Sequence, residues 1–172
     1  MKRKIKLRKG LFRLIYIFLV GLVLSSCSVL STGTTPESFY PVMRVIDGDT
    51  FWLDNGSEKG IKVRLIGVDA PETRRTRNKE IGYYAQESKE YLKNLIEGKE
   101  VRLGYDVDTL DYYKRTLAYV YTEKGLFVNA ELVKKGYAMV MTVPPNVRYA
   151  EKFVKLARKA RKKERGLWGE EE

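Results

Sequence analysis

The sequence predicts an α+β fold, a small closed β-barrel of five strands with three helices. Two observations lead to this prediction. Five short runs rich in apolar residues follow one another between residues 39 and 121, with turn residues between them. Three other segments carry apolar residues at helical spacing, one between the third and fourth runs and two after the fifth.

The strands are expected at Phe39–Ile46, Thr50–Leu53, Ile61–Asp69, Val101–Tyr105 and Arg115–Tyr121. Asn-Gly readily adopts positive φ, so the Asp54–Ser57 segment should be a turn that makes the second and third strands an antiparallel pair. In the fifth strand, Leu117, Tyr119 and Tyr121 alternate with smaller residues, which is typical of a strand with one buried face.

The helices are expected at Tyr84–Ile96, Asn129–Lys135 and Tyr149–Glu164. Gly98 and Gly136 stand where a glycine ends a helix. An apolar stretch at residues 137–143 is followed by Pro144-Pro145-Asn146, which should form a turn. This order of elements favours the OB-fold, a barrel whose open face commonly holds nucleic acid.

The N-terminus has the layout of an export signal. A basic stretch precedes an apolar run from Leu14 to Leu24, which is short for a membrane span and suits a signal peptide. The segment Leu24–Cys27 resembles a bacterial lipobox, in which the cysteine is lipidated, and Cys27 is the only cysteine. The alternative is an uncleaved signal anchor with a chance cysteine.

We therefore expect four regions along the chain: a lipoprotein signal peptide at 1–26, the lipidated Cys27 with a flexible tether at 27–38, the barrel domain at 39–169 and an acidic tail at 170–172. The predicted location is the cell envelope, outside the cytoplasm and lipid-anchored to a membrane. The domain is expected to be a monomer.

The formal charge of +11 is concentrated at the N-terminus. Of 33 basic residues, seven lie in residues 1–26, which hold no acid, so the rest of the chain has 26 basic and 22 acidic residues, or +4. A phosphate-binding surface must therefore come from local clustering. The chain has no histidine, which excludes histidine-based triads, general bases and metal ligands.

Three carboxylates and two arginines form a candidate site at the strand ends. Asp49 precedes the second strand and Asp69 ends the third, so an antiparallel pair would bring them together as oxygen ligands for Ca²⁺ or Mg²⁺. Glu72 could orient or deprotonate a water. Arg64 and Arg115 could each grip a phosphate, although each could equally form a structural contact.

The positions of Arg64 and Asp69 present a difficulty. They are five residues apart, so a regular strand places them on opposite faces. A bulge or kink is needed to bring them together, and Gly67 is a suitable place for it.

Three blocks together resemble the staphylococcal nuclease (thermonuclease) family: Ile46–Thr50, Arg64–Glu72 and Asp111–Val120. The resemblance extends from about Val42 to Trp168. It implies an OB-fold enzyme that cleaves DNA and RNA with Ca²⁺.

The resemblance also implies residue roles. Asp49 and Asp69 match the calcium ligands, together with the carbonyl of Ala70. Glu72 matches the general base or water-positioning group, and Arg64 and Arg115 match the arginines that clamp the phosphate. Tyr113 matches a nucleotide-contacting tyrosine.

Three departures from the family pattern stand out. Ala70 replaces a threonine, Lys114 replaces a glycine, and the segment Met139–Val143 lacks two tyrosines. The sequence thus favours a calcium-dependent nuclease of low base specificity. The alternatives are a non-catalytic OB-fold module that binds nucleic acid and an envelope protein that uses the barrel to bind another protein.

Overall fold

The computed structural model describes residues 38–75 and 81–169. Its elements in chain order are β1 (Phe39–Asp47), β2 (Thr50–Leu53), β3 (Ile61–Leu65), β4 (Val68–Asp69), α2 (Ala85–Ile96), β5 (Glu100–Gly104), β6 (Thr116–Thr122), α3 (Val128–Lys135), β7 (Met139–Val140), α4 (Ala150–Lys162) and the 3₁₀ helix η1 (Gly166–Trp168).

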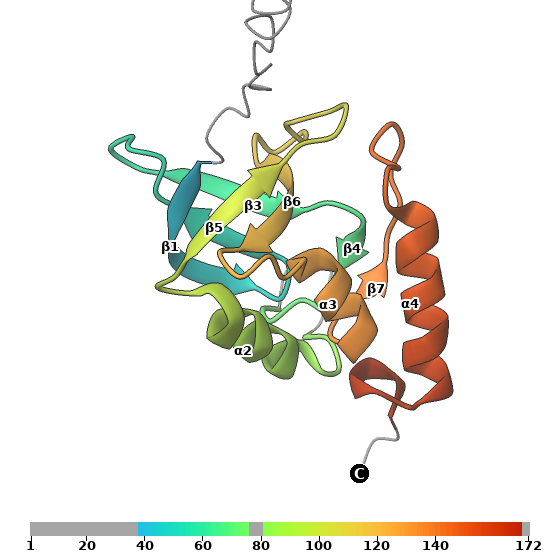
Figure 1. Ribbon diagram of the computed structural model, residues 1–172. Helices are drawn as coiled ribbons and strands as arrows, with labels where there is room; N and C mark the ends of the chain where they lie inside the picture. The colour runs from blue at the N-terminus through green and yellow to red at the C-terminus, as the bar shows by residue number, and fades with distance from the viewer. Residues whose placement is uncertain (1–37, 76–80, 170–172) are drawn as a thin grey trace, which may run out of the picture. The chain divides into compact units, whose positions relative to one another are not determined.

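Five of the strands close a barrel in the order β1-β2-β3-β6-β5 (Figure 1). Neighbouring strands are antiparallel except β3 and β6, which run parallel and pair Arg64 with Leu117. The predicted five-stranded barrel with three helices is confirmed.

The predicted single strand Ile61–Asp69 is wrong at its centre. The chain leaves the barrel after Leu65, turns at Ile66-Gly67, and forms the short strand β4, which pairs with β7. Gly67 has φ 79°, and a Cβ added there would lie 2.5 Å from Cε2 of Phe153. Both the backbone conformation and the close packing of α4 therefore require glycine at this turn.

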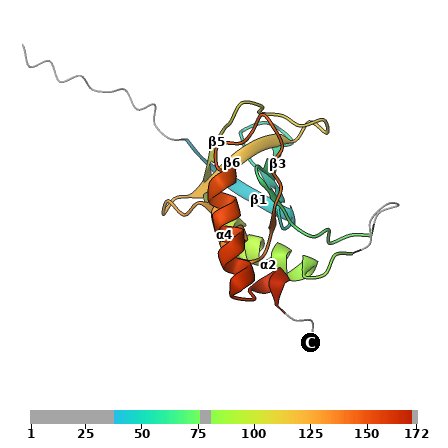
Figure 2. The same ribbon diagram turned by 90° about the vertical axis from the view of Figure 1, so that its right-hand side faces the viewer.

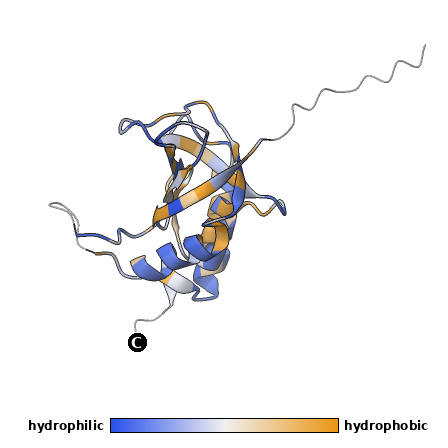
Figure 3. Cartoon of the chain, turned by 90° about the vertical axis from the view of Figure 1, so that its left-hand side faces the viewer, coloured by the Kyte–Doolittle hydropathy of each residue, from blue (hydrophilic) through white to orange (hydrophobic). Residues whose placement is uncertain are grey.

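The core fills the barrel and continues under the helices. Phe51, Val63 and Tyr119 are among the fully buried side chains of the barrel, while α2 contributes Leu92 and α4 contributes Phe153. The outward side of α2 is hydrophilic (Figure 3). The same core thus fixes the barrel and the helices that flank the site.

The predictions for the N-terminus, including lipidation of Cys27, and for the acidic tail fall outside the described residues. Within residues 38–75 and 81–169, no helix has the length and apolar character needed to cross a membrane.

Candidate active site

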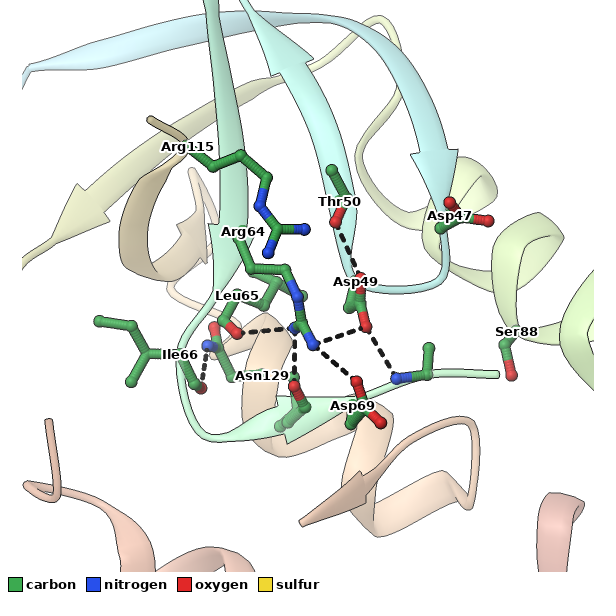
Figure 4. A network of polar contacts seen from close by, with 12 residues as sticks. Asp47, Asp49, Thr50, Arg64, Leu65, Ile66, Asp69, Ser88, Arg115 and Asn129 are labelled. Carbon is green, nitrogen blue, oxygen red and sulfur yellow. Dashed lines mark hydrogen bonds and ion pairs between the residues drawn. The ribbon is translucent and has the colours of Figure 1, made fainter. Parts of the chain in front are cut away.

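The turn at Ile66-Gly67 brings Arg64 and two aspartates together (Figure 4). Nη2 of Arg64 lies 3.1 Å from Oδ2 of Asp49 and donates a hydrogen bond of 2.8 Å to Oδ1 of Asp69. The expected kink at Gly67 therefore solves the problem of strand alternation, because the chain reverses before it reaches Asp69.

The guanidinium of Arg64 is also fixed by the backbone around it. Nη1 donates to the carbonyl oxygens of Leu65, at 3.0 Å, and Val68, at 2.7 Å. Its side chain is 11% exposed. A buried guanidinium with several fixed acceptors is a rigid, oriented positive charge.

Asp49 is buried, and its carboxylate is shared among several donors. The Thr50 hydroxyl donates to Oδ1 at 2.8 Å, and the Ala70 N–H donates to Oδ2 at 2.8 Å. Burial raises the pKa of Asp49 above its usual value, even though the Arg64 charge and these two hydrogen bonds act to lower it. The backbone of Ala70 thus lies directly beside Asp49, so the replacement of threonine there leaves the backbone contact in place.

The second arginine is oriented by a carboxylate that the sequence analysis did not single out. Asp111 accepts the Arg115 backbone N–H at 2.8 Å through Oδ1 and the side-chain Nε–H at 2.6 Å through Oδ2. Burial tends to raise the pKa of Asp111, but the hydrogen bonds and charge of Arg115 outweigh it and lower that pKa. Because Asp111 contacts Nε, the Nη groups of Arg115 are directed toward Arg64 (Figure 4).

The two arginines line one cavity of about 180 Å³. Its other walls come from the Ile66–Val68 turn, the loop that holds Asp111, and the segment after β7, including Met141 and Pro144. Asp108 and Asp111 also line the cavity, and Asp111 is paired with Arg115. The Nη groups of Arg115 stay directed into the site, so a concave site with largely apolar walls can still hold an anionic ligand that carries an apolar group.

Lys114 occupies a position that normally favours glycine. Its φ is 63°, so this lysine adopts the left-handed conformation that a glycine would adopt easily. The loop reaches Arg115 in spite of the substitution. Tyr113, 75% exposed, does not line the cavity, and its ring lies under the Arg115 guanidinium at 5.4 Å.

The segment of Glu72 is tied to the end of β1. The Thr73 backbone and hydroxyl both donate to Oδ1 of Asp47. The carbonyl of Glu72 accepts the Gly82 N–H at 3.0 Å. Glu72 does not line the cavity of the two arginines.

The metal-ligand set is sparse in the described part of the chain, which contains no group of three or more acidic, histidine or cysteine side chains able to hold an ion. Asp49 and Asp69 nevertheless offer two carboxylates at one place, with the Ala70 backbone beside them. An oxygen-only donor set fits a hard cation whose remaining ligands are water or substrate. Such an ion would compete with Nη2 of Arg64 for the carboxylate oxygens.

Two buried asparagines hold the walls of the site. Asn129 accepts the Val120 N–H at 2.9 Å and donates to the carbonyl of Ile66 at 2.9 Å. Asn146 and the backbone of Asp108 exchange two hydrogen bonds of 2.8 Å. Sequence reasoning placed Asn146 in a turn but assigned neither asparagine a role in the site, because Ile66 and Asp108 are 63 and 38 residues from their asparagines. For Asn146, the available signal was its place directly after Pro144 and Pro145.

The comparisons with known proteins agree with this geometry. Residues 62–170 match the family described as staphylococcal nuclease homologue. The chain is 38% identical over 132 residues to a thermonuclease of Staphylococcus hyicus, covering 77% of this chain and 76% of that protein. It is 39% identical over 138 residues to the thermonuclease of Staphylococcus intermedius, covering 80% of each.

A third relative is much longer than this chain. The endonuclease YhcR of Bacillus subtilis is 34% identical over 136 residues, which cover 75% of this chain and 11% of that protein. The family match at residues 62–170 includes Arg64, Asp69 and Arg115. On these grounds the chain belongs to the staphylococcal nuclease family.

Proposed function

We propose that this protein is a Ca²⁺-dependent nuclease that hydrolyses DNA and RNA with little base specificity, and that it acts outside the cytoplasm from a lipid anchor at Cys27. The enzyme class, a nuclease, follows from its family. The observation that best supports the proposed chemistry is the contact of Arg64 with both Asp49 and Asp69, with Arg115 lining the same cavity.

The arginines supply the positive charge that hydrolysis of a phosphodiester requires. Negative charge grows on the phosphoryl oxygens as a water attacks, and fixed donors aimed at these oxygens lower the barrier. Two backbone carbonyls orient Nη1 of Arg64 and Asp111 orients Arg115, so the direction of each guanidinium is fixed by the protein before the reaction. Arg115 uses only Nε for Asp111, so both of its Nη groups can donate to one phosphate. Nη2 of Arg64 can donate to a phosphate once the bound ion takes its place on Asp49 and Asp69.

Asp49, Asp69 and the Ala70 carbonyl would hold the Ca²⁺. When bound, such an ion polarises the phosphoryl group and offsets its charge. In this proposal Glu72 orients the attacking water or takes its proton, and the link between Thr73 and Asp47 fixes the segment that carries Glu72. None of these roles needs a covalent intermediate with the enzyme.

The first experiment incubates the purified chain with single-stranded DNA and, separately, with RNA, in Ca²⁺ and then in excess chelator. Cleavage that stops on chelation and returns with Ca²⁺ supports the proposal. Binding without cleavage in any divalent metal contradicts it, and favours a non-catalytic binding module.

Variants test the residue assignments. Asp69→Asn and Arg115→Ala should each lower the cleavage rate by about 10²-fold or more. Asp69→Asn removes a charged ligand of the proposed ion, and Arg115→Ala removes positive charge at the reacting phosphate. The matched controls are Asp54→Asn and Arg158→Ala, which change exposed residues outside the cavity and should cut at the parental rate. Parental rates for Asp69→Asn and Arg115→Ala would show that the site is wrongly assigned.

The anchor has a separate test. Bacterial cells that express the full chain should hold it in the membrane fraction, and a radiolabelled fatty acid should be incorporated. Cys27→Ser should abolish incorporation of the label, whereas Ser28→Ala should retain it. Equal labelling of parent and Cys27→Ser would exclude lipidation at this cysteine.

A further inference from the structure

We propose that a row of basic side chains along α4 binds the sugar–phosphate backbone of a single strand that continues beyond the catalytic cavity. This row, called here the α4 stripe, consists of Arg148, Lys152, Lys155, Lys159 and Lys162. The proposal rests on the proposed nuclease function and adds a second contact region for the substrate.

The α4 stripe follows the repeat of a helix. Its members are three or four residues apart, so they lie on one side of α4, and Arg148 continues the row just before the helix begins. At a rise of about 1.5 Å per residue, Lys152 and Lys162 are about 15 Å apart along the axis. The row is thus long enough to meet several phosphates in succession.

The opposite side of α4 packs against the core. Phe153, Ala157 and Ala160 are buried, while the lysines of the α4 stripe are exposed. Figure 2 presents α4 toward the viewer, with no described segment in front of it. The stripe is therefore open to a large ligand.

Arg148, Lys152, Lys155 and Lys159 line one shallow depression together with Glu151 and Leu156. Among the described residues that line the depression, Glu151 is the acid, and it is 3.8 Å from Lys155 with both side chains more than 70% exposed. Such an exposed pair is weak and screened by salt. Arg148 is also paired, with Asp106 at 3.6 Å, so the positive charge of the depression comes mainly from its three lysines.

Aromatic rings accompany the basic groups at one end of the stripe. Nζ of Lys152 lies 4.9 Å from the ring centre of Phe127 and 5.8 Å from that of Tyr149. Basic side chains interleaved with aromatic rings are typical of surfaces that bind single-stranded nucleic acid.

The α4 stripe begins where the catalytic cavity ends. Pro144, Pro145 and Asn146 line the cavity beside Arg115, and Arg148 follows two residues later. The hydrogen bonds between Asn146 and Asp108 hold this connection in place. A strand that leaves the cavity over this segment therefore meets Arg148 first and then the lysines of α4.

An anionic lipid surface is the competing partner for a basic helix. A helix that lies in a lipid interface places its apolar side among the lipids, but the apolar side of α4 is buried in the core. The linear row, its link to the cavity and the adjacent rings favour a nucleic-acid strand.

The test uses the full chain in detergent, with chelator present so that no cleavage occurs. Fluorescence anisotropy measures binding of labelled single-stranded DNA of about 5 and about 25 nucleotides, one near the lower end of the span of one OB-fold and one beyond that span. The variant is Lys152→Gln/Lys155→Gln/Lys159→Gln. The matched control, Lys59→Gln/Lys93→Gln/Lys124→Gln, removes three exposed lysines elsewhere.

The stripe variant should bind the long strand about tenfold more weakly at low salt. The slope of the logarithm of its binding constant against the logarithm of salt concentration should become shallower by up to about 2. Its binding of the short strand, and its cleavage of the short strand in Ca²⁺, should stay within about twofold of the parent. The control variant should bind both lengths like the parent.

Three results would overturn the proposal: parental binding of the long strand by the stripe variant, equal losses for both lengths, or losses as large in the control. Weaker binding to vesicles of phosphatidylglycerol with unchanged binding of the long strand would assign the stripe to the membrane instead. Absence of cleavage in the parent would refute the nuclease proposal, and the binding result would still decide the role of the stripe.

Discussion

Replacement of Asn129 by alanine should cost much of the stability of the domain, although Asn129 contacts no proposed substrate or metal. Its side chain is fully buried. Oδ1 accepts the Val120 N–H at 2.9 Å, and Nδ2 donates to the carbonyls of Ile66, at 2.9 Å, and Ala118, at 3.3 Å. One amide therefore joins α3, β6 and the turn that follows β3.

The magnitude follows from the groups left without a partner. In Asn129→Ala the Val120 N–H and the Ile66 carbonyl lose the bonds that Asn129 makes, whereas the Ala118 carbonyl keeps the Ile66 N–H at 3.0 Å. Each buried polar group left unpaired costs about 1–3 kcal/mol, so we expect the two groups together to cost about 2–6 kcal/mol. A domain of typical stability, about 5–15 kcal/mol, would remain folded but weakened.

The assay is urea unfolding of the chain from Ser38 onward, followed by the fluorescence of Trp52 and Trp168. The midpoint should fall without a change in slope. Asn129→Asp should be worse than alanine at neutral pH, because a carboxylate oxygen would face two carbonyls. The control, Asn55→Ala, removes bonds in an exposed turn and should cost about 0.5 kcal/mol. A loss in Asn129→Ala no larger than in this control would refute the reasoning.

Three further predictions concern the backbone and acid stability. Lys114→Gly should stabilise the fold by about 1 kcal/mol in urea unfolding, because it relieves a φ of 63°. Gly67→Ala should cost more than about 2 kcal/mol and lower the cleavage rate, since its Cβ would meet the Phe153 ring. Burial tends to raise the pKa of Asp106, but hydrogen bonds from the Tyr119 hydroxyl and a backbone N–H lower it below 3.8. The stability that results is present above about pH 4 and is lost as the pH falls through the lowered pKa. Asp106→Asn should therefore remove this acid dependence from the urea unfolding midpoints.

The barrel and the main site residues could be predicted because their signals are local. The Asn55-Gly56 turn and the runs of apolar residues define the strands, and the spacing of Asp49, Arg64 and Asp69 places them at neighbouring strand ends. The identity of Gly67 even indicated where the third strand must bend. These features depend on the repeat of apolar residues and on turn residues, both of which are visible within a few positions of the sequence.

The contacts that orient the site could not be predicted in the same way. Asn129 is 63 residues from Ile66, and Asn146 is 38 residues from Asp108, so no local pattern connects them. The pairing of β4 with β7 is likewise set by tertiary packing, because a strand of two residues is too short to show the alternation of apolar and polar residues that predicts a strand. Asp111 had a local signal, four residues before Arg115, but its role appears only with the loop geometry.

The site depends on an interruption of the barrel rather than on the barrel itself. Arg64 belongs to β3, but Asp69 reaches it only because the chain turns at Gly67, and this turn is held from outside the barrel. Asn129 of α3 binds Ile66, the Met141 N–H donates to the Gly67 carbonyl at 3.1 Å, and Phe153 of α4 packs on Gly67.

Two kinds of substitution should therefore be distinguishable. Changes at the turn or at Asn129 should lower stability and activity together, because they loosen the geometry that joins Arg64 to Asp69. Changes at Arg115 should lower activity with little effect on the barrel, because its side chain is partly exposed and its ion-pair partner, Asp111, lies in a loop. In the proposed mechanism, the helices thus act on the chemistry through packing, and Arg115 acts on it directly.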